Sequence, residues 1–148
     1  MIDVQAVYDQ EVKKNVAKRE KRENEIYKFG EEVARPMFSE FFGKLSIFTT
    51  KNDYILTNET KDLNVEEDGD NYTVSYSYGT RLCSTAVRLY VSAEATFNKD
   101  NGISYQLKYR FKDSDKVSYF NNCDKEKLFD DFFLAFIPEV VERQFPTK

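Results

Sequence analysis

The sequence predicts an α+β fold with a long N-terminal helix, an antiparallel β-meander of five or six strands, and a C-terminal helix packed on one sheet face. Two runs of alternating apolar and polar residues between Arg81 and Lys112 indicate a long β-hairpin. Apolar residues recur at helical spacing before and after this hairpin. The 148 residues contain no repeat, linker or second domain, so a single domain over residues 1–148 is predicted.

Residues 1–43 form the predicted N-terminal helical segment, and Asp3 is suited to cap its start. Its apolar side chains recur every three or four residues, but the stretch Lys13–Glu25 is almost wholly charged. Pro36 lacks an N–H group and clashes with the preceding turn, so a kink is expected near it. Gly43 is the predicted end of the helix.

The sheet is predicted over residues 46–121 and begins with two short strands. Ser46–Thr50 and Tyr54–Thr57 flank residues 51–53, whose Lys-Asn-Asp sequence suits a turn. Farther along the chain, Asp68-Gly69 is the predicted two-residue turn of an acidic hairpin. The register expected for that hairpin places Val65 opposite Tyr72 and Leu63 opposite Val74.

Residues 87–97 and 103–112 are the two long strands predicted for the central hairpin, each with one apolar and one polar face. A two-residue Asn101-Gly102 turn would pair apolar-face residues with polar-face residues. A five-residue loop is therefore expected. The register that keeps the apolar faces together pairs Phe97 with Ile103, Ala95 with Tyr105 and Val91 with Tyr109.

The chain is predicted to end with one more strand and a helix. In the strand Lys116–Asn121, the side chains of Val117 and Tyr119 are expected to point toward the core. The helix is predicted over residues 124–145, with an aspartate N-cap, and Pro138 interrupts its wide apolar stripe. A stripe of that width indicates burial against the sheet.

Composition argues against most kinds of catalysis. The chain has no histidine, the usual general base and commonest metal ligand, and no glycine-rich phosphate loop. No catalytic residue, metal ligand or cofactor is predicted. The net charge of −4 gives no general attraction to nucleic acid, and no apolar run is long enough to cross a membrane. Two cysteines without a signal sequence predict a cytoplasmic protein with free thiols.

Two groups keep an enzymatic alternative open. The carboxylates Glu66, Glu67, Asp68 and Asp70 could act as acid and base, although a solvated hairpin tip explains them as well. Cys123 precedes a predicted helix N-terminus, which favours a thiolate. Without a histidine partner, a structural free thiol is the preferred interpretation.

Two basic surfaces are the candidate binding sites. The first is the charged part of the N-terminal helix, with Lys13, Lys14, Lys18, Arg19, Lys21 and Arg22. The second is the polar face of the central hairpin, with Arg88, Tyr90, Lys108, Arg110 and Lys112, extended by Lys116, Ser118 and Phe120. A solvated helix and a soluble sheet face would explain both. Like charges placed opposite each other, however, do not stabilise a sheet.

These surfaces predict a non-catalytic macromolecule-binding protein, a small regulator or inhibitor that docks on a protein or nucleoprotein with an acidic surface. Nucleic acid and a homodimer remain open as partners, and no membrane partner is expected. The alternative is a small-ligand carrier with a tyrosine-lined cavity between sheet and helices. The tyrosines expected to face that interior are Tyr72, Tyr76, Tyr105, Tyr109 and Tyr119. The chain is biased toward Asn, Lys, Asp, Tyr and Phe, as proteins encoded by AT-rich genomes are, and this bias alone suggests a viral origin.

Overall fold

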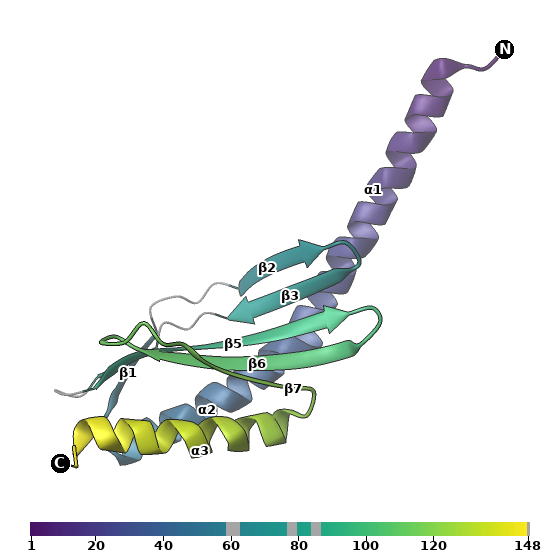
Figure 1. Cartoon of the computed structure of the whole chain (residues 1–148). Coiled ribbons are helices and arrows are strands. Elements are labelled where there is room, and N and C mark those ends of the chain that lie inside the picture. Colours follow the sequence, from purple (N-terminus) through teal and green to yellow (C-terminus); the bar gives the residue numbers. More distant parts are fainter. Residues whose placement is uncertain (59–62, 77–79, 84–86, 148) are drawn as a thin grey trace.

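The computed structural model describes residues 1–58, 63–76, 80–83 and 87–147. Its helical elements are α1 (Val4–Phe29), the π-helical turn η1 (Gly30–Ala34), α2 (Arg35–Lys51) and α3 (Lys125–Gln144). The strands are β1 (Ile55–Asn58), β2 (Leu63–Asp68), β3 (Asn71–Tyr76), β4 (Thr80–Cys83), β5 (Arg88–Asn98), β6 (Gly102–Phe111) and β7 (Ser118–Asn122). The predicted α+β fold class is confirmed (Figure 1).

The strands form one antiparallel sheet organised around β5. Along one edge, β5 pairs with β4 and then with β3, which are joined to β1 and β2 respectively. Along its other edge it pairs with β6, which pairs with β7. β1 and β2 lie end to end, and they pair with β4 and β3, which also lie end to end. If each of these two pairs is counted as one strand, the sheet is a five-stranded antiparallel meander.

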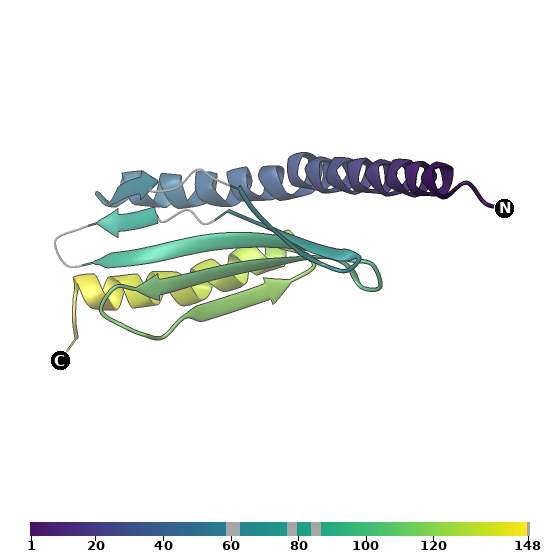
Figure 2. The same ribbon diagram turned by 90° about the horizontal axis from the view of Figure 1, so that it is seen from above.

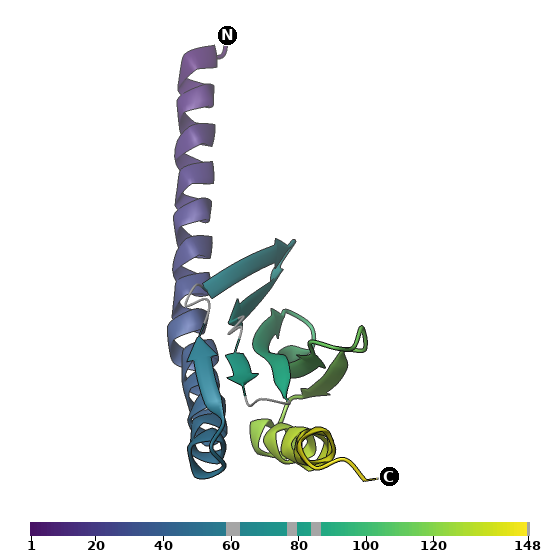
Figure 3. The same ribbon diagram turned by 90° about the vertical axis from the view of Figure 1, so that its left-hand side faces the viewer.

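The helices cover one face of this sheet. Alternate residues of β5 and β6 are buried, whereas the residues between them are exposed or half-buried. Figures 2 and 3 show α2 and α3 side by side on the same side of the curved sheet. The core between them is rich in aromatic rings, and its fully buried side chains include Phe38, Phe41, Phe132 and Phe136.

The central hairpin has the predicted register. Phe97 pairs with Ile103, Ala95 with Tyr105 and Val91 with Tyr109. The loop is shorter than the five residues predicted, because Asn98 pairs with Gly102 and only residues 99–101 lie between the strands. The Asn98 side chain accepts hydrogen bonds from the backbone N–H groups of Asp100 and Asn101. Gly102 then takes a φ of +80°, which a glycine adopts without steric cost. The prediction that burial outweighs the Asn-Gly turn preference is confirmed.

The predicted strand Ser46–Thr50 is wrong, because α2 continues through Gly43 to Lys51. Leu45 and Thr49, four residues apart, are both buried and extend the apolar stripe of the helix. The helix ends in a Schellman motif. The Tyr54 N–H donates to the Thr49 carbonyl at 2.9 Å, and Asp53 has a left-handed φ of 58°.

The helix is irregular where a kink was expected, and the irregularity is the π-helical turn η1, which ends two residues before Pro36. The Arg35 N–H donates to the Gly30 carbonyl, five residues earlier rather than four. A wider turn leaves room for the proline ring, which would clash with the preceding turn of a regular helix. The helical segment therefore runs on from α1 into α2.

The predicted register of the acidic hairpin is wrong by two residues. Val65 pairs with Val74, and the turn consists of Gly69 and Asp70. Gly69 has a φ of +60°, so glycine occupies the first central position, as a type II′ turn requires. The register predicted earlier would have placed an aspartate there. Both registers turn the same residues toward the helices.

The predicted orientation of the last strand is wrong. Phe120 pairs with Leu107 on the covered face, and Tyr119 pairs with Lys108 on the open face. The Phe120 ring lies 6.0 Å from that of Tyr109 and 5.6 Å from that of Phe132, so it joins the aromatic core. Burial of the phenylalanine decides the orientation, because Tyr119 has a hydroxyl that water can satisfy.

Both predicted helix caps are confirmed. The Asp3 carboxylate accepts from the N–H groups of Gln5 and Ala6, and the Asp124 carboxylate from those of Glu126 and Lys127. Pro138 lies inside α3, which continues past it to Gln144. The apolar stripe of α3 packs on β6 and β7, as its width predicted.

Candidate binding surfaces

The N-terminal part of α1 projects from the body of the protein. Every residue from Met1 to Lys21 is exposed, and Arg22 is the first that is half-buried. Figure 1 shows the N-terminal part of α1 extending away from the sheet, whereas α2 lies beside the sheet. Five of the six predicted basic residues, Lys13, Lys14, Lys18, Arg19 and Lys21, lie on this exposed part.

The sixth basic residue, Arg22, is bound within the fold. Its guanidinium donates to the carbonyl of Gly69 at 2.6 Å and to those of Asp70 and Asn71 at 3.3 Å. It also pairs with Glu67 at 3.2 Å and lies 5.0 Å from the centre of the Tyr72 ring. Arg22 therefore holds the β2–β3 turn against α1 and is not offered to a partner.

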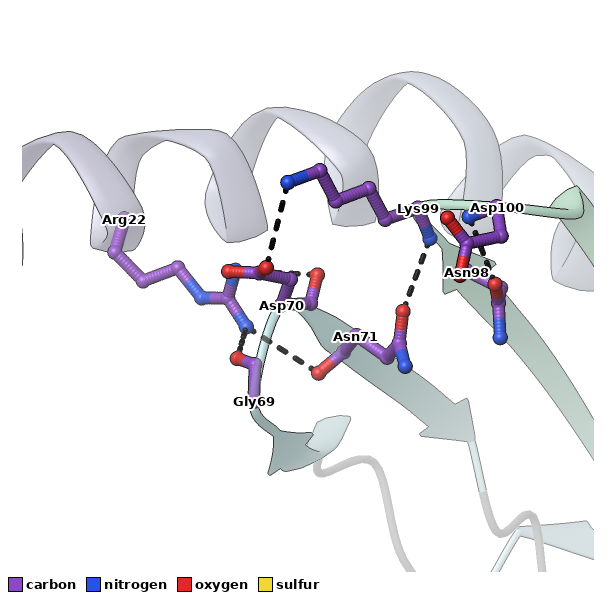
Figure 4. A network of polar contacts seen from close by, with 7 residues as sticks. All are labelled: Arg22, Gly69, Asp70, Asn71, Asn98, Lys99 and Asp100. Carbon is purple, nitrogen blue, oxygen red and sulfur yellow. Dashed lines mark hydrogen bonds and ion pairs between the residues drawn. The ribbon is translucent and has the colours of Figure 1, made fainter.

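Lys99 links the same turn to the neighbouring hairpin (Figure 4). Its backbone N–H donates to the Asn71 side chain at 2.9 Å, and its ammonium group lies 3.5 Å from the Asp70 carboxylate. The two hairpin tips and α1 thus form one polar cluster at the point where the helix leaves the body. The projecting helix has a defined base.

The open face of the sheet gathers the second predicted set. Tyr90 pairs with Arg110 and Ser92 with Lys108, and the Lys112 N–H donates to the Arg88 carbonyl at 2.9 Å. The Arg110 guanidinium lies 5.4 Å from the centre of the Tyr90 ring, a cation–π arrangement. Arg88, Arg110 and Lys112 are exposed. We call Arg88, Tyr90, Lys108, Arg110 and Lys112 the cationic face.

One carboxylate, Glu94, accompanies the cationic face. It lies 3.8 Å from the Lys108 ammonium group, so it neutralises that lysine in part. Tyr119, predicted to point inward, adds a 57% exposed aromatic ring beside Lys108. The sequence did not reveal this exposed ring, because the turn between β6 and β7 does not determine which residues of β7 face the core.

The inward tyrosines are packed in different ways. Tyr72 and Tyr109 are buried against phenylalanine rings, Tyr105 is half-buried, and the side chain of Tyr76 lies outside the described residues. Tyr119 cannot line an interior cavity. The hydroxyl of Tyr109 donates to the Glu139 carboxylate on α3 at 2.7 Å, which joins sheet and helix.

Burial, and then the hydrogen bond to Glu139, raises the pKa of Tyr109 from 10.0 to about 12. Because the folded-state pKa lies above the unfolded value, the protonated phenol stabilises the fold. That contribution is complete below pH 10 and is lost as the pH rises toward about 12.

Tyr109→Phe should therefore make the melting temperature fall less steeply between pH 10 and about pH 12. Tyr119→Phe, the same change at an exposed ring, should not. Equal slopes for both variants would contradict the assignment.

The carboxylates and the cysteine that kept an enzymatic alternative open lie on the protein surface. Glu66, Glu67, Asp68 and Asp70 are all exposed at the β2–β3 tip, where Glu67 pairs with Arg22 and Asp70 with Lys99. Cys123 is exposed next to the cap of α3, and the Cys83 side chain lies outside the described residues.

In the described parts of the chain, no three His, Cys, Asp or Glu side chains gather to hold a metal ion. No helix in those parts is both long and apolar enough to span a bilayer.

Comparison with known proteins gives no relative. No protein-family model matches the chain, and neither does any curated protein or solved structure. Function therefore has to be argued from the two exposed surfaces, the projecting helix and the cationic face.

Proposed function

We propose that this protein is a non-catalytic binding protein, a small regulator or inhibitor that docks on a protein or nucleoprotein with an acidic surface. The observation that carries the proposal is the cationic face. On the side of the sheet that the helices leave uncovered, arginine, lysine and tyrosine side chains stand in adjacent cross-strand pairs. The projecting part of α1 is the second docking element.

Solubility alone does not account for this arrangement. Arg88, at the start of β5, lies opposite Lys112, the residue that follows β6, and like charges so placed cost stability. Arginine and tyrosine are also the residues most enriched where interfaces carry their binding energy. The pair Tyr90 and Arg110 combines a flat apolar ring with a forked donor, which suits a carboxylate-bearing surface.

The protein as a whole has a net charge of −4, so attraction to an acidic partner has to be local. Acidic groups gather elsewhere, at the β2–β3 tip, and give the molecule a charge asymmetry. An acidic partner is therefore attracted in one orientation only. An acidic protein surface is favoured over nucleic acid, because the cationic face offers phosphates only four basic side chains, and affinity for nucleic acid grows with the number of phosphates neutralised.

Capture of partners from the native host by the immobilised chain tests this proposal. We expect a retained protein or nucleoprotein whose binding weakens steeply with added salt, since screening acts over roughly 8 Å at physiological ionic strength. Mass spectrometry identifies the partner, and nuclease treatment distinguishes protein from nucleic acid. Failure to retain any partner, or retention that salt does not affect, would contradict docking through charged surfaces.

A further inference from the structure

An apolar stripe runs along the projecting part of α1. Val4, Tyr8, Val12 and Val16 recur every fourth residue and are 73%, 63%, 41% and 47% exposed. Residues three and four apart share one face of a helix, and such steps connect Tyr8 to Arg22. The stripe therefore lies on the same side of the helix as Arg22, and this side faces the core farther along the chain. The stripe is therefore the outward extension of the side that packs on the sheet, beyond the point where the sheet ends.

The same stretch divides into two halves of opposite charge. Residues 3–12 contain three carboxylates, Asp3, Asp9 and Glu11, and no lysine or arginine. Residues 13–21 contain five basic side chains and one carboxylate, Glu20, a net charge of +4. A helix with these two halves attracts a copy of itself that runs in the opposite direction and repels one that runs in the same direction.

We propose that the projecting helices of two copies of this chain pair antiparallel and form a homodimer. This inference rests on the proposed role of α1 as a docking element and names its partner. The acidic half of each helix lies against the basic half of the other, and the two apolar stripes meet between them. Contacts of this kind set both orientation and register in helix pairs.

The body of the protein fixes how far the helices overlap. Arg22 holds the β2–β3 turn against the core-facing side of α1, so a second helix on that side meets the turn there. The free stretch, residues 4–21, is about 27 Å long. Full overlap of two such stretches puts the symmetry axis close to Val12. Tyr8 of one copy then lies near Val16 of the other, and Glu11 near Lys13.

Light scattering and sedimentation of the full chain test the assembly. We expect a concentration-dependent dimer of the 17.4 kDa chain. Val12→Glu should weaken the dimer at least about tenfold, because it puts two carboxylates at the axis in place of two apolar side chains. The helix itself should persist, since glutamate is the better helix former. Gln10→Glu adds the same charge to the opposite side of the helix and should leave the dimer intact.

Disulfide trapping tests the direction of the helices. In a background with serine at both native cysteines, Tyr8→Cys and Val16→Cys chains are mixed and oxidised. Antiparallel pairing predicts mainly mixed disulfides, whereas parallel pairing predicts mainly Tyr8→Cys and Val16→Cys homodimers. A preponderance of homodimers, a dimer that survives Val12→Glu, or a monomer at the highest soluble concentration would overturn the inference.

The two proposals fail separately. A monomeric chain that still captures an acidic partner would end the homodimer and leave the docking function standing. A dimer that captures no partner would do the reverse. If both hold, each dimer presents two cationic faces, and a partner with repeated acidic sites is bound more tightly than one face alone permits.

Discussion

Phe132→Ala should destabilise the protein by about 3–5 kcal/mol, the cost of emptying a fully buried phenylalanine site. Phe132 is fully buried, and its ring lies between the sheet and both covering helices. Ring centroids 4.9–5.6 Å away belong to Phe41, Tyr109, Phe120, Phe133 and Phe136. Truncation removes contacts to α2, β6, β7 and α3 at once, and none of these elements can close the gap alone.

Urea unfolding measures this effect as a lower transition midpoint with little change in slope. The matched control is Leu134→Ala, two residues along α3, where the side chain is 75% exposed and the change should stay within about 0.5 kcal/mol. Similar midpoints for the two variants would show that α3 does not pack on the sheet through this ring. The variant should unfold at a lower temperature than the unaltered chain, so the titration is run at about 10 °C or in a stabilising salt.

The central hairpin could be predicted because its signal is local and repeated. A shift of one residue would turn every apolar side chain of β5 and β6 to water, so alternation alone fixes the pairing. The caps of α1 and α3 were predictable for the same reason, since each depends on a side chain two or three residues from its partners. In these elements, sequence pattern and tertiary packing favour the same structure.

The end of α2 and the facing of β7 could not be predicted, because they depend on contacts between distant segments. Residues 46–50 have the composition of a strand, but Leu45 and Thr49 bury against the sheet only as a helix. Phe120 points inward because Tyr109 and Phe132 are already there. Local propensity differs by tenths of a kcal/mol per residue in such segments, which burial of one ring outweighs.

The candidate surfaces also include one part that the sequence predicts and one part that depends on contacts between distant segments. The cationic face follows from the hairpin register, so its members could be named from the sequence. Arg22 could not be separated from the other basic residues of the helix, because its partners lie 45–49 residues farther along the chain. Five of the six predicted cations therefore remain exposed on α1, while Arg22 stabilises the base of the projecting helix.

Arg88→Glu combined with Arg110→Glu should weaken partner binding at least about tenfold, equivalent to roughly 1.4 kcal/mol. Both side chains are exposed, and the reversal turns the centre of the cationic face from attractive to repulsive for an acidic surface. The melting temperature should stay nearly unchanged. Glutamate at position 88 would even replace the repulsion from Lys112 with an attraction.

The control must alter net charge equally without touching the face. Lys44→Glu with Lys127→Glu does so, because both lysines are exposed on the helices that cover the other side of the sheet. If general charge governs binding, the two double variants weaken it alike. If the cationic face governs it, only the first does, mainly through slower association that loses its salt dependence. Equal affinity of the first variant and the unaltered chain would show that the cationic face takes no part in binding, because the double substitution reverses the charge of two of its exposed side chains.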